Sequence, residues 1–98
     1  MDGDRLSWQD PDSILTGIGL KRGMTFIDVG CGHGFFSIPA AKIVGTSGRV
    51  IGIDIDDDGL QSIRDSAARE GLKSVETILG KAEEVIACRG CADVVFFG

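Results

Sequence analysis

The sequence predicts one small α/β domain in which buried parallel strands alternate with helices. Its 98 residues are 43% hydrophobic, which is sufficient for a single core. Apolar segments of strand length recur along the chain, at residues 26–29, 49–56, 75–79 and 94–97. Strands that are apolar on both alternating faces are typical of parallel sheets. Segments with helical spacing of apolar residues follow the first two strands.

The first predicted strand runs directly into a glycine-rich loop. Its residues 26–29 lead into Gly30, and Gly32 and Gly34 follow at alternate positions. Glycine lets the backbone turn sharply and lets a ligand approach without a Cβ in the way. Residues 35–44 then have the apolar spacing of a helix. A strand, a glycine loop and a helix N-terminus in this order predict a nucleotide-type site at the carboxyl end of the strand.

Two acidic residues indicate which ligand this loop would bind. Asp54 ends the second predicted strand about twenty residues after the loop, where βαβ units place an acid that binds ribose hydroxyls. Asp28 precedes the loop, where it would repel a pyrophosphate and suit a cationic amino group. Phe35 stands where the dinucleotide fingerprint has a small residue. A nicotinamide-dependent dehydrogenase is therefore the less favoured alternative.

These motifs resemble those of class I S-adenosylmethionine-dependent methyltransferases. The family's [D/E]-x-G-x-G-x-G motif is similar to residues 28–34, and its acid after the second strand is similar to Asp54. Its third and fourth segments are matched by residues 75–83 and 92–97. Lys81 departs from the family, which usually has an acid there near the adenine amino group, so the resemblance implies a backbone contact from Ala82 instead.

The resemblance implies S-adenosyl-L-methionine as the cofactor and a Rossmann-like three-layer sandwich as the fold. The sheet would be mainly parallel in the order 3-2-1-4, with right-handed crossovers. The cofactor-binding residues that it implies are Asp28, Gly30, Cys31, Gly32, Gly34, Asp54, Ile55 and Ala82. No catalytic residue is implied, because such enzymes mainly position the acceptor against the methyl group and often need no dedicated base.

The family's core usually has more strands than the four found here. We therefore expect residues 1–98 to form an S-adenosylmethionine-binding methyltransferase domain that is incomplete at its C-terminal side, truncated after the fourth strand and inactive alone. The alternatives are a naturally short domain completed by a partner chain and a non-catalytic cofactor-binding module. The outer edge of residues 94–97 would be unpaired and apolar, which predicts self-association.

Charge and hydropathy limit the partners. The net charge of −5 argues against a nucleic-acid acceptor and favours a small molecule or a protein as the methyl acceptor. No segment approaches the length that spans a bilayer, and no signal peptide is visible. The polar first residues suit a cytoplasmic protein without a membrane partner.

The cysteines do not predict a metal site. Cys88 and Cys91 precede the fourth strand, whereas Cys31 and His33 follow the first. In a parallel sheet these positions lie at opposite ends of a strand, roughly 17 Å apart. We therefore expect structural thiols and no metal.

Capping residues set the expected element boundaries. Asp12 or Ser13 could cap a first short helix, and Gly71 could end the helix that follows the second strand. Asp93 is expected to fix the start of the fourth strand.

Overall fold

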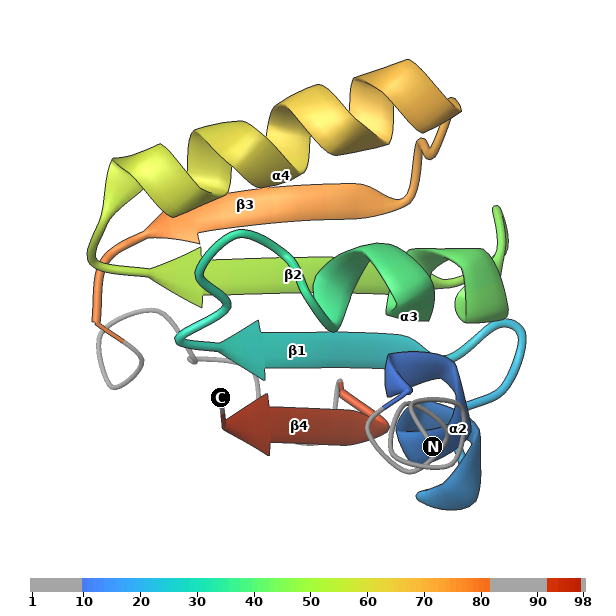
Figure 1. The fold of residues 1–98 in the computed structure, drawn as a ribbon. Coiled ribbons are helices and arrows are strands. Elements are labelled where there is room, and N and C mark those ends of the chain that lie inside the picture. The colour runs from blue at the N-terminus through green and yellow to red at the C-terminus, as the bar shows by residue number, and fades with distance from the viewer. Residues whose placement is uncertain (1–9, 82–91, 98) are drawn as a thin grey trace, which may run out of the picture.

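A computed structural model describes residues 10–81 and 92–97 (Figure 1). The elements in chain order are α2 (Pro11–Gly17), β1 (Thr25–Val29), α3 (Ser37–Val44), β2 (Arg49–Asp54), α4 (Asp57–Glu70), β3 (Val75–Leu79) and β4 (Val94–Phe97). The four strands form one parallel sheet in the order β3-β2-β1-β4, with β1 beside both β2 and β4. The predicted Rossmann-like fold and its strand order are confirmed.

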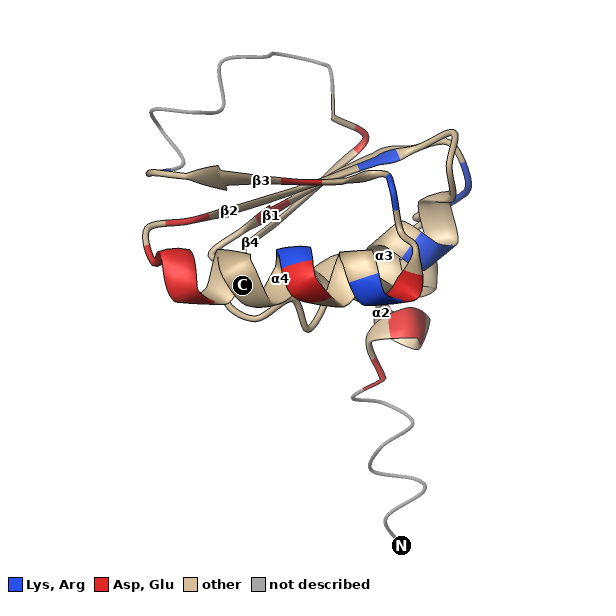
Figure 2. Cartoon of the chain, turned by 90° about the horizontal axis from the view of Figure 1, so that it is seen from above, with Lys and Arg blue, Asp and Glu red and all other residues tan. Residues whose placement is uncertain are grey.

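The three described helices lie on the same face of the sheet (Figure 2). Phe26 of β1 is in register with Val50 of β2 and with Val94 of β4, and this row packs against α2 and α3. Ile27, Ile51 and Ile53 form a second apolar cluster on the opposite face. The described residues thus supply the sheet and one helical layer of the expected sandwich.

Two helices begin at other residues than expected. Asp10 caps α2 by accepting from the backbone N–H of Asp12 at 3.3 Å, so the helix starts at Pro11 and neither Asp12 nor Ser13 is its cap. Proline suits this first position because its missing N–H would have no partner there. Helix α3 starts at Ser37, since residues 32–36 still form turns that continue the glycine loop. Gly71 ends α4 in a left-handed conformation, as predicted.

A hydrogen bond and an aromatic cluster tie β4 to β1 and to the start of α3. Asp93 accepts a hydrogen bond from the backbone N–H of Thr25 at 2.8 Å, which confirms its expected role at the start of the strand. Phe96 packs against Phe36 with ring centroids 4.5 Å apart and against Phe26 at 6.1 Å. Because Phe36 directly precedes α3, this aromatic cluster joins β4 to the end of the glycine loop.

Metal-binding and membrane-spanning features were sought among residues 10–81 and 92–97. These residues contain no cluster of three or more His, Cys, Asp or Glu that could hold a metal ion. None of their helices is long and apolar enough to cross a membrane. Cys88 and Cys91 lie outside the described residues.

Candidate functional site at the carboxyl edge of the sheet

A hollow of about 230 Å³ opens where β1, β2 and β3 end. It is lined by Val29, Gly30, Ile53, Asp54, Ile55, Gly80 and Lys81. In open α/β sheets, ligands bind outside the carboxyl ends of the strands. The hollow therefore lies where the sequence predicts a ligand, and it includes three of the predicted residues.

The glycine loop is held against β2 by its own backbone. The N–H of Gly30 donates to the carbonyl of Ile53 at 2.8 Å. Gly30, Gly32 and Gly34 all have positive φ, at 70°, 55° and 90°, so each adopts a conformation that other residues avoid. A Cβ at Gly32 would meet no atom within 4 Å, whereas one at Gly34 would lie 2.8 Å from Ile63 of α4. Gly32 thus leaves open space above the loop, and Gly34 allows close packing of α4.

Asp54 holds the loop as well as facing the hollow. Its Oδ2 accepts from the N–H of Gly32 at 2.9 Å, and its Oδ1 accepts from the N–H of Asp56 at 3.0 Å. These backbone N–H groups, that of Gly32 first, lower the pKa of the Asp54 carboxyl below its ordinary value. A carboxylate has about four acceptor sites, so acceptor capacity remains for a ligand.

Asp28 lies at the other side of the loop and is almost fully buried. Its side chain is 2% exposed, and its Oδ2 accepts a hydrogen bond from the Ser37 hydroxyl at 2.7 Å. Burial raises the pKa of Asp28, the nearby charge of Asp54 raises it further, and the hydrogen bond from Ser37 opposes both effects. The sequence analysis missed Ser37, since a serine in the first turn of a helix usually indicates only a cap.

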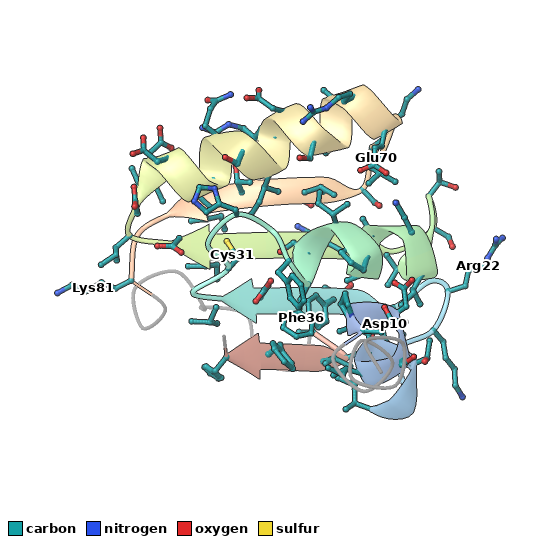
Figure 3. The ribbon with its side chains drawn as sticks, viewed as in Figure 1. Asp10, Arg22, Cys31, Phe36, Glu70 and Lys81 are labelled. Atoms are coloured by element: carbon teal, nitrogen blue, oxygen red, sulfur yellow. The ribbon has the colours of Figure 1, made fainter. Side chains whose placement is uncertain are left out.

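Cys31 contributes its backbone to the loop and its side chain to the core (Figure 3). The thiol packs with Leu60 and Ile63 of α4, and a Cβ at Gly52 of β2 would lie only 3.0 Å from its sulfur. Burial raises the pKa of this thiol to about 12. Because Cys31 is only 7% exposed, we expect its main chain rather than its thiol to face a ligand.

The predicted residue Ile55 and the neighbouring Lys81 line the outer part of the hollow. Ile55 is 73% exposed and follows directly after Asp54. Lys81 extends from the sheet edge into solvent (Figure 3). Ala82 lies outside the described residues, so its implied backbone contact stays a prediction.

Gly59 is a further residue that the sequence analysis missed. It lies in the first turn of α4, and a Cβ there would overlap the backbone carbonyl of Gly32. The absence of this one atom lets α4 approach the glycine loop. No local pattern marks the position, because the contact joins residues that are far apart in sequence.

Replacing Asp28 with asparagine is expected to stabilise the free protein. The pKa of Asp28 is raised from 3.8 in the folded protein, so folding favours the protonated, neutral carboxyl. The stability that this carboxyl contributes is fully present below pH 3.8 and is lost as the pH rises through the raised pKa. Asp28→Asn removes the buried charge and can still accept from Ser37. At neutral pH, Tm of the variant should therefore be higher than that of the unaltered chain. Thermal melts measure it, and a lower Tm in the variant would contradict this account.

Comparisons with known proteins agree with this geometry. A family model described as "Methyltransferase domain" matches residues 20–98. A protein of Pyrobaculum calidifontis named "Probable cobalt-precorrin-6B C(15)-methyltransferase (decarboxylating)" is 39% identical over 85 residues, which are 86% of this chain and 44% of that protein. A ribosomal protein L11 methyltransferase of Photobacterium profundum is 40% identical over 67 residues, 68% of this chain and 20% of that protein.

Solved structures of methyltransferases also match this chain. The crystal structure of a SAM dependent methyltransferase from Aquifex aeolicus matches with a TM-score of 0.80 at 33% identity, over 90% of this chain and 47% of that one. The C-terminal domain of precorrin-6Y C5,15-methyltransferase from Rhodobacter capsulatus matches with a TM-score of 0.73 at 27% identity, over 86% of this chain and 45% of that one. The chain thus spans less than half the length of each of these four proteins.

Proposed function

The chain belongs to the class I S-adenosylmethionine-dependent methyltransferases, and we propose that it binds S-adenosylmethionine across its glycine loop as the cofactor-binding part of such an enzyme. The observation that carries the proposal is the pair of carboxylates, Asp28 and Asp54, on either side of a loop that is open at Gly32. A cationic amino group and a ribose diol are the two parts of this cofactor that carboxylates recognise.

The residues around the hollow fit the cofactor's adenosine end. Asp54 would accept hydrogen bonds from the ribose hydroxyls, and the exposed Ile55 would lie against the purine ring. The volume of about 230 Å³ is below the roughly 300–1,000 Å³ of pockets that enclose a whole ligand. The hollow therefore suits the nucleoside, and the methionine part would extend over Gly32 toward Asp28.

The chain's own contribution to methyl transfer would be binding and orientation. When bound, S-adenosylmethionine supplies a methyl group that its sulfonium activates for displacement. Asp28 would hold the amino group and Asp54 the ribose, so that the methyl group is fixed relative to the acceptor. We assign no catalytic residue.

The acceptor that we propose is a small molecule or a protein. The net charge of −5 disfavours a phosphate backbone as the partner. Two relatives are named for methylation of a cobalt-precorrin and of ribosomal protein L11, so the family match does not single out one acceptor. We further propose a cytoplasmic location for the protein.

Calorimetric titration tests the cofactor assignment. S-adenosylhomocysteine, the demethylated product, should bind this chain at one site, whereas NAD should give no binding heat. The dehydrogenase alternative predicts the reverse, and it requires a small residue where Phe35 stands with 62% of its surface exposed. Binding of NAD in preference to S-adenosylhomocysteine would refute the proposal.

We also propose that residues 1–98 are the cofactor-binding half of a methyltransferase and show no turnover alone. This proposal is supported by how little of each relative the chain covers. The match spans 44% of the Pyrobaculum calidifontis protein and 47% of the chain in the Aquifex aeolicus structure. Adding S-adenosylmethionine with candidate acceptors to this chain should give no methylated product. Turnover by the 98 residues would show that they form a complete enzyme.

The outer edge of β4 is expected to make this chain self-associate. Among the described strands β4 pairs only with β1, and its Val95 and Phe97 are 42% and 67% exposed. The other edge strand, β3, carries Glu76 paired to Arg49 at 2.7 Å, whereas β4 has no charged residue. Charges on edge strands prevent edge-to-edge pairing.

A lysine in each edge strand distinguishes the two edges. Val95→Lys should shift the light-scattering mass toward the monomer, while Leu79→Lys in β3 should leave it unchanged. A monodisperse monomer of the unaltered chain would contradict the prediction.

A further inference from the structure

We infer that Ser37 is a positioning residue for the cofactor's amino group, because its hydroxyl fixes the carboxylate of Asp28 between β1 and α3. The Ser37 Oγ donates to Oδ2 of Asp28 at 2.7 Å, and both side chains are buried, at 0% and 2% exposure. The inference rests on the proposed function, in which Asp28 receives that amino group.

The serine is not placed to cap its own helix. The N-cap of α3 is Phe36, which makes no side-chain hydrogen bond, and Ser37 is one position inside the helix. Serine at a helix start normally gives its oxygen to a backbone N–H of the first turn. Here the hydroxyl instead donates away from the helix, to a strand residue nine positions earlier. Helix initiation therefore does not account for this hydroxyl.

The other neighbours of Asp28 in the sheet offer it no side-chain donor. Gly52 of β2 and Phe96 of β4 are its register partners, and neither has a polar side chain. The hydrogen bonds of the described residues give the carboxylate one side-chain partner, the Ser37 hydroxyl. Without that hydroxyl, no side chain among the described residues would hydrogen-bond the carboxylate and fix its orientation.

The charges around Asp28 increase the importance of this hydrogen bond. The titratable groups that face it are Asp54 at the end of β2 and Cys31 in the glycine loop. Strand β4 has no titratable side chain, and Lys42, the only charged residue of α3, pairs with Glu70 in α4. Burial and Asp54 both raise the pKa of Asp28, and Ser37 opposes them. Without the hydroxyl, the carboxylate would become neutral at a higher pH and would then no longer attract an ammonium group.

Two ligands separate this role from a general structural one. S-adenosylhomocysteine carries the amino acid group, and 5′-methylthioadenosine lacks it. Ser37→Ala should bind S-adenosylhomocysteine roughly tenfold more weakly, as expected for loss of a hydrogen bond to a charged group. Its affinity for 5′-methylthioadenosine should be unchanged. The loss of S-adenosylhomocysteine affinity on acidification should also begin at a higher pH in Ser37→Ala than in the unaltered chain.

Three further variants test whether the effect comes from altered packing and whether Ser37 acts through Asp28. Ser37→Thr keeps a hydroxyl and should restore affinity, whereas Ser37→Cys keeps the size with a weaker donor and should behave like Ser37→Ala. In an Asp28→Asn background, Ser37→Ala should cause no further loss, because the two residues act as a unit. Thermal melts confirm that each variant is folded, and Ser37→Cys replaces Ser37→Ala if the latter is not.

The possible outcomes are distinct. The positioning role would be overturned if Ser37→Ala lost affinity for both ligands equally, or if its affinity for S-adenosylhomocysteine were unchanged. Failure of the unaltered chain to bind either ligand would overturn the proposed function itself and the inference with it. Normal binding of 5′-methylthioadenosine with selective loss of S-adenosylhomocysteine would support both.

Discussion

Replacing Asp54 with alanine is expected to weaken S-adenosylhomocysteine binding by roughly 10- to 100-fold, the effect of losing hydrogen bonds to a charged group. The carboxylate would bind the ribose hydroxyls, and it also accepts from the backbone N–H groups of Gly32 and Asp56. The variant would therefore lose a ligand contact and a constraint on the glycine loop together. Calorimetric titration at neutral pH measures the change.

The matched control for this substitution is Asp58→Ala. Asp58 is an exposed acid in the first turn of α4, close in sequence to Asp54. Asp58→Ala changes the net charge by the same amount as Asp54→Ala. The variant therefore measures any long-range electrostatic effect on ligand binding. Affinity close to that of the unaltered chain is expected. If Asp54→Ala binds as tightly as Asp58→Ala, the assignment of Asp54 to the ribose is wrong.

The second large effect is expected from Gly59→Ala. The new Cβ would overlap the backbone carbonyl of Gly32, and a backbone atom cannot move aside as the end of a flexible side chain can. Either the loop or α4 must shift, and such overpacking typically costs about 1–3 kcal/mol. The variant should therefore melt at a lower temperature and bind S-adenosylhomocysteine more weakly, although Gly59 itself would not touch the ligand.

Gly17→Ala provides the control for the added methyl group. Gly17 also lies in a helix, and a Cβ there would meet no atom within 4 Å. Alanine at that position should leave binding unchanged and should not lower Tm, since alanine is favoured over glycine in helices. An unaltered Tm and unaltered affinity in Gly59→Ala would show that α4 does not shape the glycine loop.

The sequence alone predicted the parts of this structure that depend on local patterns. Residues 26–29 could be identified as a buried strand and residues 30–34 as a turn because apolar runs and alternating glycines are local signals. Resemblance to a family then supplied the strand order, which periodicity cannot give. The boundaries were less exact. Asp10 caps α2 through a hydrogen bond within one turn, and α3 begins only after the turns of residues 32–36, with Phe36 as an N-cap that makes no side-chain hydrogen bond.

The features that the sequence did not reveal involve contacts between distant residues. Ser37 was missed because its partner is in a strand, and Gly59 because its neighbour is the glycine loop. Cys31 stays among the residues predicted to bind the ligand, and its packing with Leu60 and Ile63 of α4 was not visible from the sequence. Asp54 was expected to serve a ribose, and its hydrogen bond to Gly32 appeared only when β2 and the loop were seen together.

The central claim is that the cofactor lies at the carboxyl edge of the sheet, across the glycine loop. Mapping of amide chemical shifts by nuclear magnetic resonance, on adding S-adenosylhomocysteine to the isotope-labelled chain, tests it most directly. The account predicts the largest shifts in residues 30–34, 54–56 and 80–81. Little change is expected at the opposite edge of the sheet, where the strands begin, around Thr25 and Arg49. Shifts concentrated at that opposite edge, or no shifts in the glycine loop at saturating ligand, would contradict it.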